Sequence, residues 1–411
     1  MDPLGGLNIS PSNHAGGVLW RNRQLECFQA VVDRNLQQVR MLRIQRTLPE
    51  RYSLADRPAL LEMVLSAKET LGESCLILGH HYQHDDIMEF ADASGDSFGL
   101  SRIAASTTAA TKIVFCGVHF MAESADILTR EDQHVFLPDL NAGCSMADMA
   151  DIDSVEDAWA ALGEHLDMNR VMPITYMNSS AALKAFVGRH GGAVCTSSNA
   201  KAVLTWALHD LVDGSPRADK VLFFPDQHLG RNTGFQLGYA EQEMLLWNPR
   251  FELGGLDSSH VDGAKLLLWK GHCSVHQRFR PEQIADFRSR FPEGLVLVHP
   301  ECAHDTVAEA DVVGSTDAII KAVEAAPAGA AIGIATEIHL VNRLAKQRPD
   351  CTVECLDPLV CPCATMARID LPHLAWLLES LVAGDEPNRI MVDDDTSLWA
   401  KVALERMLAI T

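Results

Sequence analysis

The sequence predicts an α/β protein made of three similar lobes, each with a small parallel sheet between helices. From Ser74 onward, short runs rich in Val, Ile, Leu and Phe alternate with Ala-rich amphipathic stretches, which is the pattern of alternating strands and helices. The apolar runs form three groups of three. We therefore expect three αβα lobes in a pseudo-threefold arrangement around a central active site.

The nine predicted strands are short, and they divide the chain into segments. They cover residues 76–78, 113–115, 135–137, 171–176, 193–195, 221–224, 295–298, 311–313 and 330–334. Helix-like apolar spacing also occurs at 18–48, but no chemical motif accompanies it, so we treat residues 1–50 as an accessory N-terminal extension. We place the lobes at 51–160, 161–260 and 261–350. Residues 351–411 are then a cysteine-rich loop followed by helices that pack on the lobes.

Composition and charge argue against several classes of protein. The chain has 34 basic and 55 acidic side chains, a formal charge of -21 that would repel a polyphosphate backbone, so we expect no nucleic-acid partner. No apolar run reaches the roughly 18 residues of a membrane span, and the amino terminus lacks the basic and apolar parts of a signal peptide. We therefore expect a cytoplasmic protein without membrane contact.

Polar residues follow directly after several of the predicted strands. Ligands of parallel sheets bind at the carboxyl ends of the strands, so these residues are candidates for a shared site. Any one of them could instead be an ordinary turn or helix-cap residue. Six such groups together favour a common central cavity. They are Gly79-His80-His81-Tyr82, Tyr176-Met177-Asn178, Thr196-Ser197-Ser198, His228, His299-Pro300-Glu301 and Gly314-Ser315-Thr316.

The cysteines are of two kinds. Eleven cysteines in a chain expected to be cytoplasmic indicate metal binding, catalysis or burial rather than a disulfide framework. Those within or beside apolar runs are typical of small buried hydrophobes. This group is Cys27, Cys75, Cys116 and Cys195, and Cys302 stays unassigned.

The other cysteines lie in predicted loops. Cys144 and Cys273 each follow a glycine within two residues, which would let the backbone approach a bulky cofactor. The carboxyl-terminal group is Cys351, Cys355, Cys361 and Cys363. No CxxC pair occurs in the chain, so the spacing matches neither a zinc finger nor a ferredoxin. A metal site assembled from distant loops and a redox-sensing thiol cluster both remain open on spacing alone.

Ten segments, in order, resemble quinolinate synthase. The resemblance covers roughly residues 74–381. The segments are GHHYQ at Gly79, ADASGDS ending at Ser97, LPDLNAGCSMAD around Cys144, TYMNSSAALKA at Thr175, CTSSNA at Cys195, FPDQHLGRNTG at Phe224, WKGHCSVH at Trp269, LVHPEC at Leu297, DVVGST at Asp311 and CPCATMARIDLPHL at Cys361.

The resemblance implies a transferase of NAD biosynthesis with one 4Fe-4S cluster. The implied reaction condenses iminoaspartate with dihydroxyacetone phosphate to give quinolinate, phosphate and two waters. Two implied cluster ligands are Cys144 and Cys273. The third comes from the CPC segment, where we take Cys363, with Cys361 as the alternative. Three thiolate ligands would leave one iron open to substrate as a Lewis acid.

The family's other functional positions fall mostly at the predicted strand ends. Proton transfer is assigned to Tyr82, Glu301 and His80. His228 and His276 could be chemical or structural. Besides the two substrates, the enzyme that supplies iminoaspartate is a candidate partner. The implied substrate contacts are His80, Ser97, Tyr176, Met177, Asn178, Ser197, His299, Pro300, Glu301 and Thr316.

Two rival functions are kept in view. Another hydro-lyase with an open-iron cluster, acting on a different hydroxy acid, would use similar residues. A non-catalytic redox or metal sensor would need a partner surface and would have no use for the HPE and GST segments. Cys351 and Cys355 are not required by the implied chemistry, and they could form a reversible disulfide or merely line the loop.

Overall fold

A computed structural model describes residues 45–359 and 362–410 of the chain. These residues belong to one compact unit that begins at Gln45. Residues 1–44 of the predicted extension, and with them Cys27, lie outside the described residues, as does Cys361. None of the helices in the described ranges is both long and apolar enough to cross a membrane.

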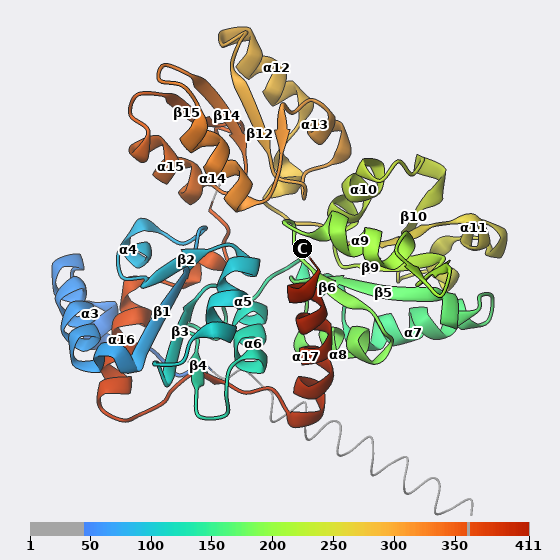
Figure 1. Cartoon of the computed structure of the whole chain (residues 1–411). Coiled ribbons are helices and arrows are strands. Elements are labelled where there is room, and N and C mark those ends of the chain that lie inside the picture. The colour runs from blue at the N-terminus through green and yellow to red at the C-terminus, as the bar shows by residue number, and fades with distance from the viewer. Residues whose placement is uncertain (1–44, 360–361, 411) are drawn as a thin grey trace, which may run out of the picture. The chain divides into compact units, whose positions relative to one another are not determined.

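Three mainly parallel sheets form the framework, with helices packed against them (Figure 1). In the first sheet the order is β16-β4-β3-β1-β2, in the second β10-β11-β9-β5-β6 and in the third β13-β12-β14-β15. The first sheet contains β1 Cys75–His80, β2 Ala93–Gly95, β3 Lys112–Cys116, β4 His134–Phe136 and β16 Arg389–Ile390. The second contains β5 Val171–Tyr176, β6 Ala193–Cys195, β9 Lys220–Phe224, β10 Met244–Trp247 and β11 Leu266–Trp269. The third contains β12 Leu295–Val298, β13 Val312–Val313, β14 Ala331–Ala335 and β15 Thr352–Cys355.

The longer helices precede, separate or follow these strands along the chain, and parallel neighbours in a sheet need such crossover connections. They are α3 Arg57–Leu71, α5 Ser97–Ser106, α6 His119–Leu128, α7 Ile152–Gly163, α8 Ala181–Arg189, α9 Ala200–Leu208, α10 Gln227–Gln236, α12 Pro281–Arg290, α14 Thr316–Ala325, α15 Ile338–Gln347, α16 Leu371–Val382 and α17 Asp394–Ala409. The short ones are α2 Glu50–Ser53, α4 Asp85–Met88, α11 Ser258–Gly263 and α13 His304–Ala308. A two-stranded hairpin joins β7 Leu211–Val212 to β8 Ser215–Pro216.

The prediction of an α/β fold with small parallel sheets is confirmed. All nine predicted strands form, within a residue or so of their expected bounds. The strands β2, β7, β8, β10, β11, β15 and β16 were not predicted. Of these, β2 is Ala-Ser-Gly and has no apolar run, while β10 and β11 are apolar and carry the usual strand signal. The pseudo-threefold arrangement stays a prediction.

The last two helices pack back onto earlier parts of the chain. α16 lies against α3, and α17 lies against α8 and the edge strand β6. The contact between α8 and α17 is close because Gly188 has no side chain: a Cβ there would lie 2.0 Å from the carbonyl oxygen of Trp399. The helical tail therefore contributes packing to the first two sheets.

Candidate active site

One pocket collects side chains from the carboxyl ends of strands in all three sheets. Twelve of the fourteen predicted site residues line it. They are His80, Tyr82, Ser97, Cys144, Tyr176, Asn178, Ser197, Cys273, His299, Glu301, Thr316 and Cys363. A wider groove of about 1020 Å³ lies beside α3, but none of the predicted site residues lines it.

The three sheets supply these residues from equivalent strands. Each sheet contains four neighbouring strands in an equivalent order, which is β4-β3-β1-β2 in the first, β11-β9-β5-β6 in the second and β15-β14-β12-β13 in the third. The first strands (β1, β5 and β12) contribute pairs two residues apart, namely His80 and Tyr82, Tyr176 and Asn178, and His299 and Glu301. The second strands (β2, β6 and β13) are followed by the hydroxyl residues Ser97, Ser197 and Thr316. The strands β4, β11 and β15 are followed by Cys144, Cys273 and Cys363.

Two buried histidines present the same donor to the pocket. The Nδ1 atom of His80 accepts the amide of Tyr82 at 3.1 Å, and that of His299 accepts the amide of Glu301 at 3.4 Å. Burial and a neighbouring imidazole lower the pKa of each to about 3, so both rings are neutral near pH 7. With Nδ1 accepting, the proton of each neutral ring is on Nε2.

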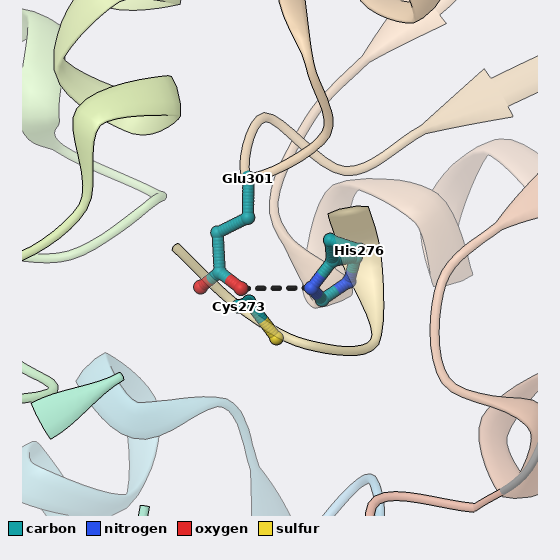
Figure 2. A group of neighbouring side chains, drawn as sticks. All are labelled: Cys273, His276 and Glu301. Atoms are coloured by element: carbon teal, nitrogen blue, oxygen red, sulfur yellow. Dashed lines mark ion pairs between the residues drawn. The ribbon is translucent and has the colours of Figure 1, made fainter. Parts of the chain in front are cut away.

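Glu301 is a buried carboxylate held by two partners. Its Oε1 accepts the Tyr176 hydroxyl at 2.5 Å, and its Oε2 lies 2.8 Å from Nδ1 of His276 (Figure 2). Burial opposes ionisation, but the imidazoles of His276 and His299 and the Tyr176 hydroxyl outweigh it and lower the pKa of Glu301. Glu301 is therefore ionised, whereas burial and this carboxylate raise the pKa of Tyr176.

A hydroxyl connects the two halves of this network. The oxygen of Thr336 lies 2.8 Å from the Tyr82 hydroxyl and 3.1 Å from Nε2 of His276. Thr316 approaches the same Tyr82 hydroxyl at 3.4 Å. Burial, followed by the nearby Glu301, raises the pKa of Tyr82, so its hydroxyl keeps its proton. The result is a continuous chain of groups from Tyr82 to Glu301 that can hold and pass protons.

The three pocket cysteines fit a bound metal cluster. All are free thiols on separate loops, and each influences the ionisation of another. Burial raises the pKa of the Cys144 thiol to about 12 and raises that of Cys273 strongly. No Lys or Arg lines the described pocket, and the pKa values of Cys144 and Cys273 are raised, so these thiols are a poor redox sensor, because sensor thiols ionise readily. They are a natural set of soft ligands for iron.

Each cysteine loop is held by a close contact with another part of the chain. The amide of Cys363 donates to Oε1 of the fully buried Glu337 at 3.2 Å. Gly271, two residues before Cys273, packs so closely on the end of β9 that a Cβ would lie 2.3 Å from the Pro225 carbonyl oxygen. An ion pair of 2.7 Å between Asp139 and Arg368 connects the Cys144 loop to the Cys363 loop.

A single metal ion is a second possibility at part of this site. The sulfur of Cys273, a ring nitrogen of His276 and a carboxylate oxygen of Glu301 lie within 4.8 Å of one another (Figure 2). One S, one N and one O donor suit zinc as well as iron. Nδ1 of His276 lies 2.8 Å from Oε2 of Glu301, but this buried nitrogen makes no hydrogen bond of good geometry within the described residues.

The remaining predicted residues lie elsewhere. Met177 is fully buried behind the pocket, with its sulfur 3.4 Å from the Ser124 hydroxyl. The carbonyl of Pro300 accepts a hydrogen bond from Asn232. His228 does not line the pocket, and His81 faces Asp317, with 3.2 Å between Nε2 and Oδ1.

The structure corrects one idea about the spare cysteines. Cys351 directly precedes β15 and Cys355 ends it, paired with Ile334 of β14. Four residues of extended strand span roughly 13 Å, whereas a disulfide needs Cα atoms within about 7 Å. A disulfide between them would require the strand to come apart, so that alternative is wrong for the folded protein.

Several pocket residues were missed from the sequence. Asp96, Thr365 and Met366 also line the pocket, as does Thr196, which belongs to one of the six predicted strand-end groups. Thr336 directly follows β14, so the same strand-end rule that found His80 could have found it. A further wall is apolar and comes from Val118, Phe120 and Met121 at the start of α6. Nothing in the local pattern distinguishes these from core residues.

Comparison with known proteins gives one consistent result. The sequence model of the family described as "Quinolinate synthetase A protein" matches residues 62–409. The chain is 54% identical over 366 residues to the quinolinate synthase of Corynebacterium glutamicum, covering 89% of this chain and 91% of that one. It is 54% identical over 356 residues to that of Streptomyces coelicolor, covering 86% and 89% of the two chains. It is 51% identical over 364 residues to that of Geobacillus kaustophilus, covering 88% and 96%.

Proposed function

The chain belongs to the quinolinate synthase family, and from this premise we propose that it condenses iminoaspartate with dihydroxyacetone phosphate to form quinolinate, phosphate and two waters. The observation that carries the proposal is the convergence of Cys144, Cys273 and Cys363 on a pocket lined by uncharged hydrogen-bond donors. The cysteines come from loops more than 80 residues apart in the chain, so their meeting is a property of the fold.

Cys144, Cys273 and Cys363 would hold one 4Fe-4S cluster. When bound by three thiolates, such a cluster supplies an iron without a protein ligand, which acts as a Lewis acid on substrate oxygen atoms. The chain's contribution to this chemistry is to hold the substrates against that position, exclude water and move protons. The apolar wall from Val118 and Phe120 serves the exclusion of water.

Anionic substrates would be bound by dipoles rather than by cations. No Lys or Arg is among the residues that line the described pocket. Ser97 and Thr316 are the first residues of α5 and α14, so two helix amino termini, each favourable for an anion, open on the pocket. The Nε2–H groups of His80 and His299 add neutral donors. This set suits carboxylate and phosphate oxygens without permanent counter-charges that would slow product release.

Glu301 is the proposed base. Its ionised carboxylate can accept a proton from a substrate carbon next to a carbonyl or imine, which is the step needed to isomerise the triose and to form the enamine. Tyr82 is the proposed proton carrier at substrate oxygen. It lies in the same network through Thr336 and His276, so the proton taken by Glu301 and the one given by Tyr82 can be exchanged within the site.

Anaerobic purification and product assay test the proposal. We expect the wild type to carry iron and sulfide at about four each per chain and to form quinolinate from the two substrates. C144A, C273A and C363A should each lose both, whereas C116A, which alters a fully buried cysteine outside the pocket, should keep both. Because Cys361 lies outside the described residues, C361A is assayed beside C363A. If C361A alone loses the cluster, Cys361 is the third ligand.

The same preparation decides between the proposed cofactor and the single-ion alternative. The single-ion site of Cys273, His276 and Glu301 would be identified by zinc or iron at about one per chain without sulfide. H276A should then abolish the bound metal, and C144A should retain it. A full cluster with no quinolinate formed, but with turnover of another hydroxy acid, would identify a different hydro-lyase.

A further inference from the structure

One equivalent position of the three sheets has polar side chains without an assigned role. Strands β1, β2 and β4 and their equivalents are followed by the polar and cysteine side chains of the pocket, whereas β3 is followed there only by the apolar wall at the start of α6. The third strands β3, β9 and β14 are each followed within three residues by a helix, α6, α10 or α15. One polar side chain near the sixth residue of each of these helices reaches a site loop of a different sheet.

Asn232 of α10 holds the loop that carries Glu301. Its side-chain amide donates to the carbonyl oxygens of Pro300 and Cys302, each at 2.9 Å, so the backbone is held on both sides of Glu301. Its oxygen lies 2.9 Å from Nδ1 of His304, which completes the amide's hydrogen bonds. Asn232 is 2% exposed, so solvent does not compete for these bonds.

Arg343 of α15 holds the loop that follows His80. Its guanidinium donates to the carbonyl oxygen of His81 at 2.9 Å and to that of Gln83 at 2.5 Å. It also donates to Oδ1 of Asp85 at 2.9 Å. The carbonyls of His81 and Gln83 flank Tyr82, just as the two carbonyls held by Asn232 flank Glu301.

Glu123 of α6 makes the third such contact. Its Oε2 accepts the amide of Ala181 at 3.0 Å, three residues after Asn178. The contacts therefore run in one direction around the three sheets. A helix of the first sheet holds a loop of the second, a helix of the second holds a loop of the third, and a helix of the third holds a loop of the first.

We propose that Asn232 and Arg343 are positioning residues that fix Glu301 and Tyr82 relative to each other across sheet boundaries. Glu301 and Tyr82 belong to different sheets, so their spacing is set by contacts between sheets. Bonds to both carbonyls on either side of a reacting residue fix its Cα and the direction of its side chain. Because a displacement of about 1 Å can cost 100-fold in rate, loss of such bonds should lower turnover in addition to any loss of stability.

N232D and R343K test the two contacts. Aspartate has the shape of asparagine but turns oxygen toward both carbonyls, and lysine keeps the charge of arginine but lacks the fork that reaches two carbonyls and Asp85 together. We expect kcat to fall about 10- to 100-fold in each, with a change in KM below about threefold and unchanged iron content. N232A, which loses the bonds without adding a buried charge, provides a second variant if N232D folds poorly.

Matched controls separate these effects from general damage. Lys346 shares Asp85 with Arg343 at 2.6 Å but has no contact with the two carbonyls, so K346Q should keep wild-type kcat. Asn248 accepts the amide of Arg250 in a turn outside the pocket, so N248D should also behave as wild type. Equal losses in K346Q and R343K would overturn the proposal for Arg343.

A double-mutant cycle tests whether Asn232 acts through Glu301. If it does, the N232D effect should shrink below about threefold in an E301Q background, because the group being positioned is already disabled. An undiminished effect in that background would overturn the proposal for Asn232.

Hydrogen exchange on the cluster-free protein gives a readout without turnover. N232D should raise exchange in residues 299–303 and leave 81–84 unchanged, and R343K should do the reverse. The kinetic arms rest on the proposed function, whereas the exchange arm does not. Wild type without quinolinate synthesis but with this exchange pattern would refute the function alone, and unchanged exchange in both variants would refute the positioning role alone.

Discussion

The ion pair between Asp139 and Arg368 should control how firmly the cluster is held. Asp139 lies five residues before Cys144, and Arg368 lies five residues after Cys363, so their 2.7 Å contact joins two cysteine loops from opposite parts of the chain. Asp139 is fully buried, and its other oxygen accepts two hydrogen bonds from Asn141. Within the described residues, Arg368 is the cation paired with this carboxylate, so R368Q would remove its counter-charge.

The expected cost follows from the burial of each partner. Removing one partner of a fully buried ion pair costs about 3–5 kcal/mol, because a charge is left unpaired. The Arg368 side chain is 44% exposed, so water can enter and hydrate the remaining carboxylate, which brings the expected loss to about 1–2 kcal/mol. If that loss falls on opening of the two loops, iron release should become about 5- to 30-fold faster.

Urea unfolding of the cluster-free protein and iron release to a chelator measure the two quantities. Arg389 and Glu386 are partly exposed and 3.9 Å apart, so their interaction is weak, and R389Q should lose no more than about 0.5 kcal/mol and release iron at the wild-type rate. D139N should cost less than R368Q because it leaves no buried charge. The reasoning is refuted if R368Q matches R389Q in both measurements.

Three further predictions concern packing, pH and oxidation. G188A should lower the free energy of unfolding by at least about 1–3 kcal/mol in urea, because its Cβ would overlap the Trp399 carbonyl unless α17 moves. Burial lowers the pKa of Lys184 from 10.5 to about 8, so between these pH values the unfolded chain binds more protons than the folded protein. The free energy of unfolding of wild type, relative to that of K184M, should therefore rise with pH over that window by up to about 3 kcal/mol in urea titrations. A difference that does not change with pH would refute this prediction. Mild oxidation of the folded protein should give no Cys351–Cys355 cross-link by mass spectrometry, whereas the same treatment in denaturant should give one.

The strands were predictable because burial on both faces leaves an unmistakable signal. β5 and β9 are nearly continuous apolar runs, and the polar residue Asn178 shortly after β5 marks where that strand meets the site. The missed strands show where this signal fails. β2 is held by its pairing with β1, from Leu78 opposite Ala93 to His80 opposite Gly95, and its own sequence of Ala, Ser and Gly has no strand preference.

The candidate site was predictable to the extent that its residues follow strands. His80 and His299 are conspicuous because a histidine after an apolar run is unusual, and Thr316 because it follows a glycine and a helix-capping serine. Their protonation was not predictable. The neutral state of His80 depends on burial and on an amide two residues away, which only the folded chain brings about.

The contacts between sheets could not be predicted from local sequence patterns, for a physical reason. Asn232 and Arg343 occupy helix positions where a polar residue normally faces solvent, and their partners are 68 and 262 residues distant in the chain. Their partners are also backbone carbonyls, which exist at every position and so carry no sequence signature. A reacting residue can be recognised in a sequence by its own chemistry, whereas a positioning residue is defined by its contacts in the folded protein. Because this pocket is built from three separate sheets, positioning residues determine whether the reacting residues meet, and only the structure identifies them.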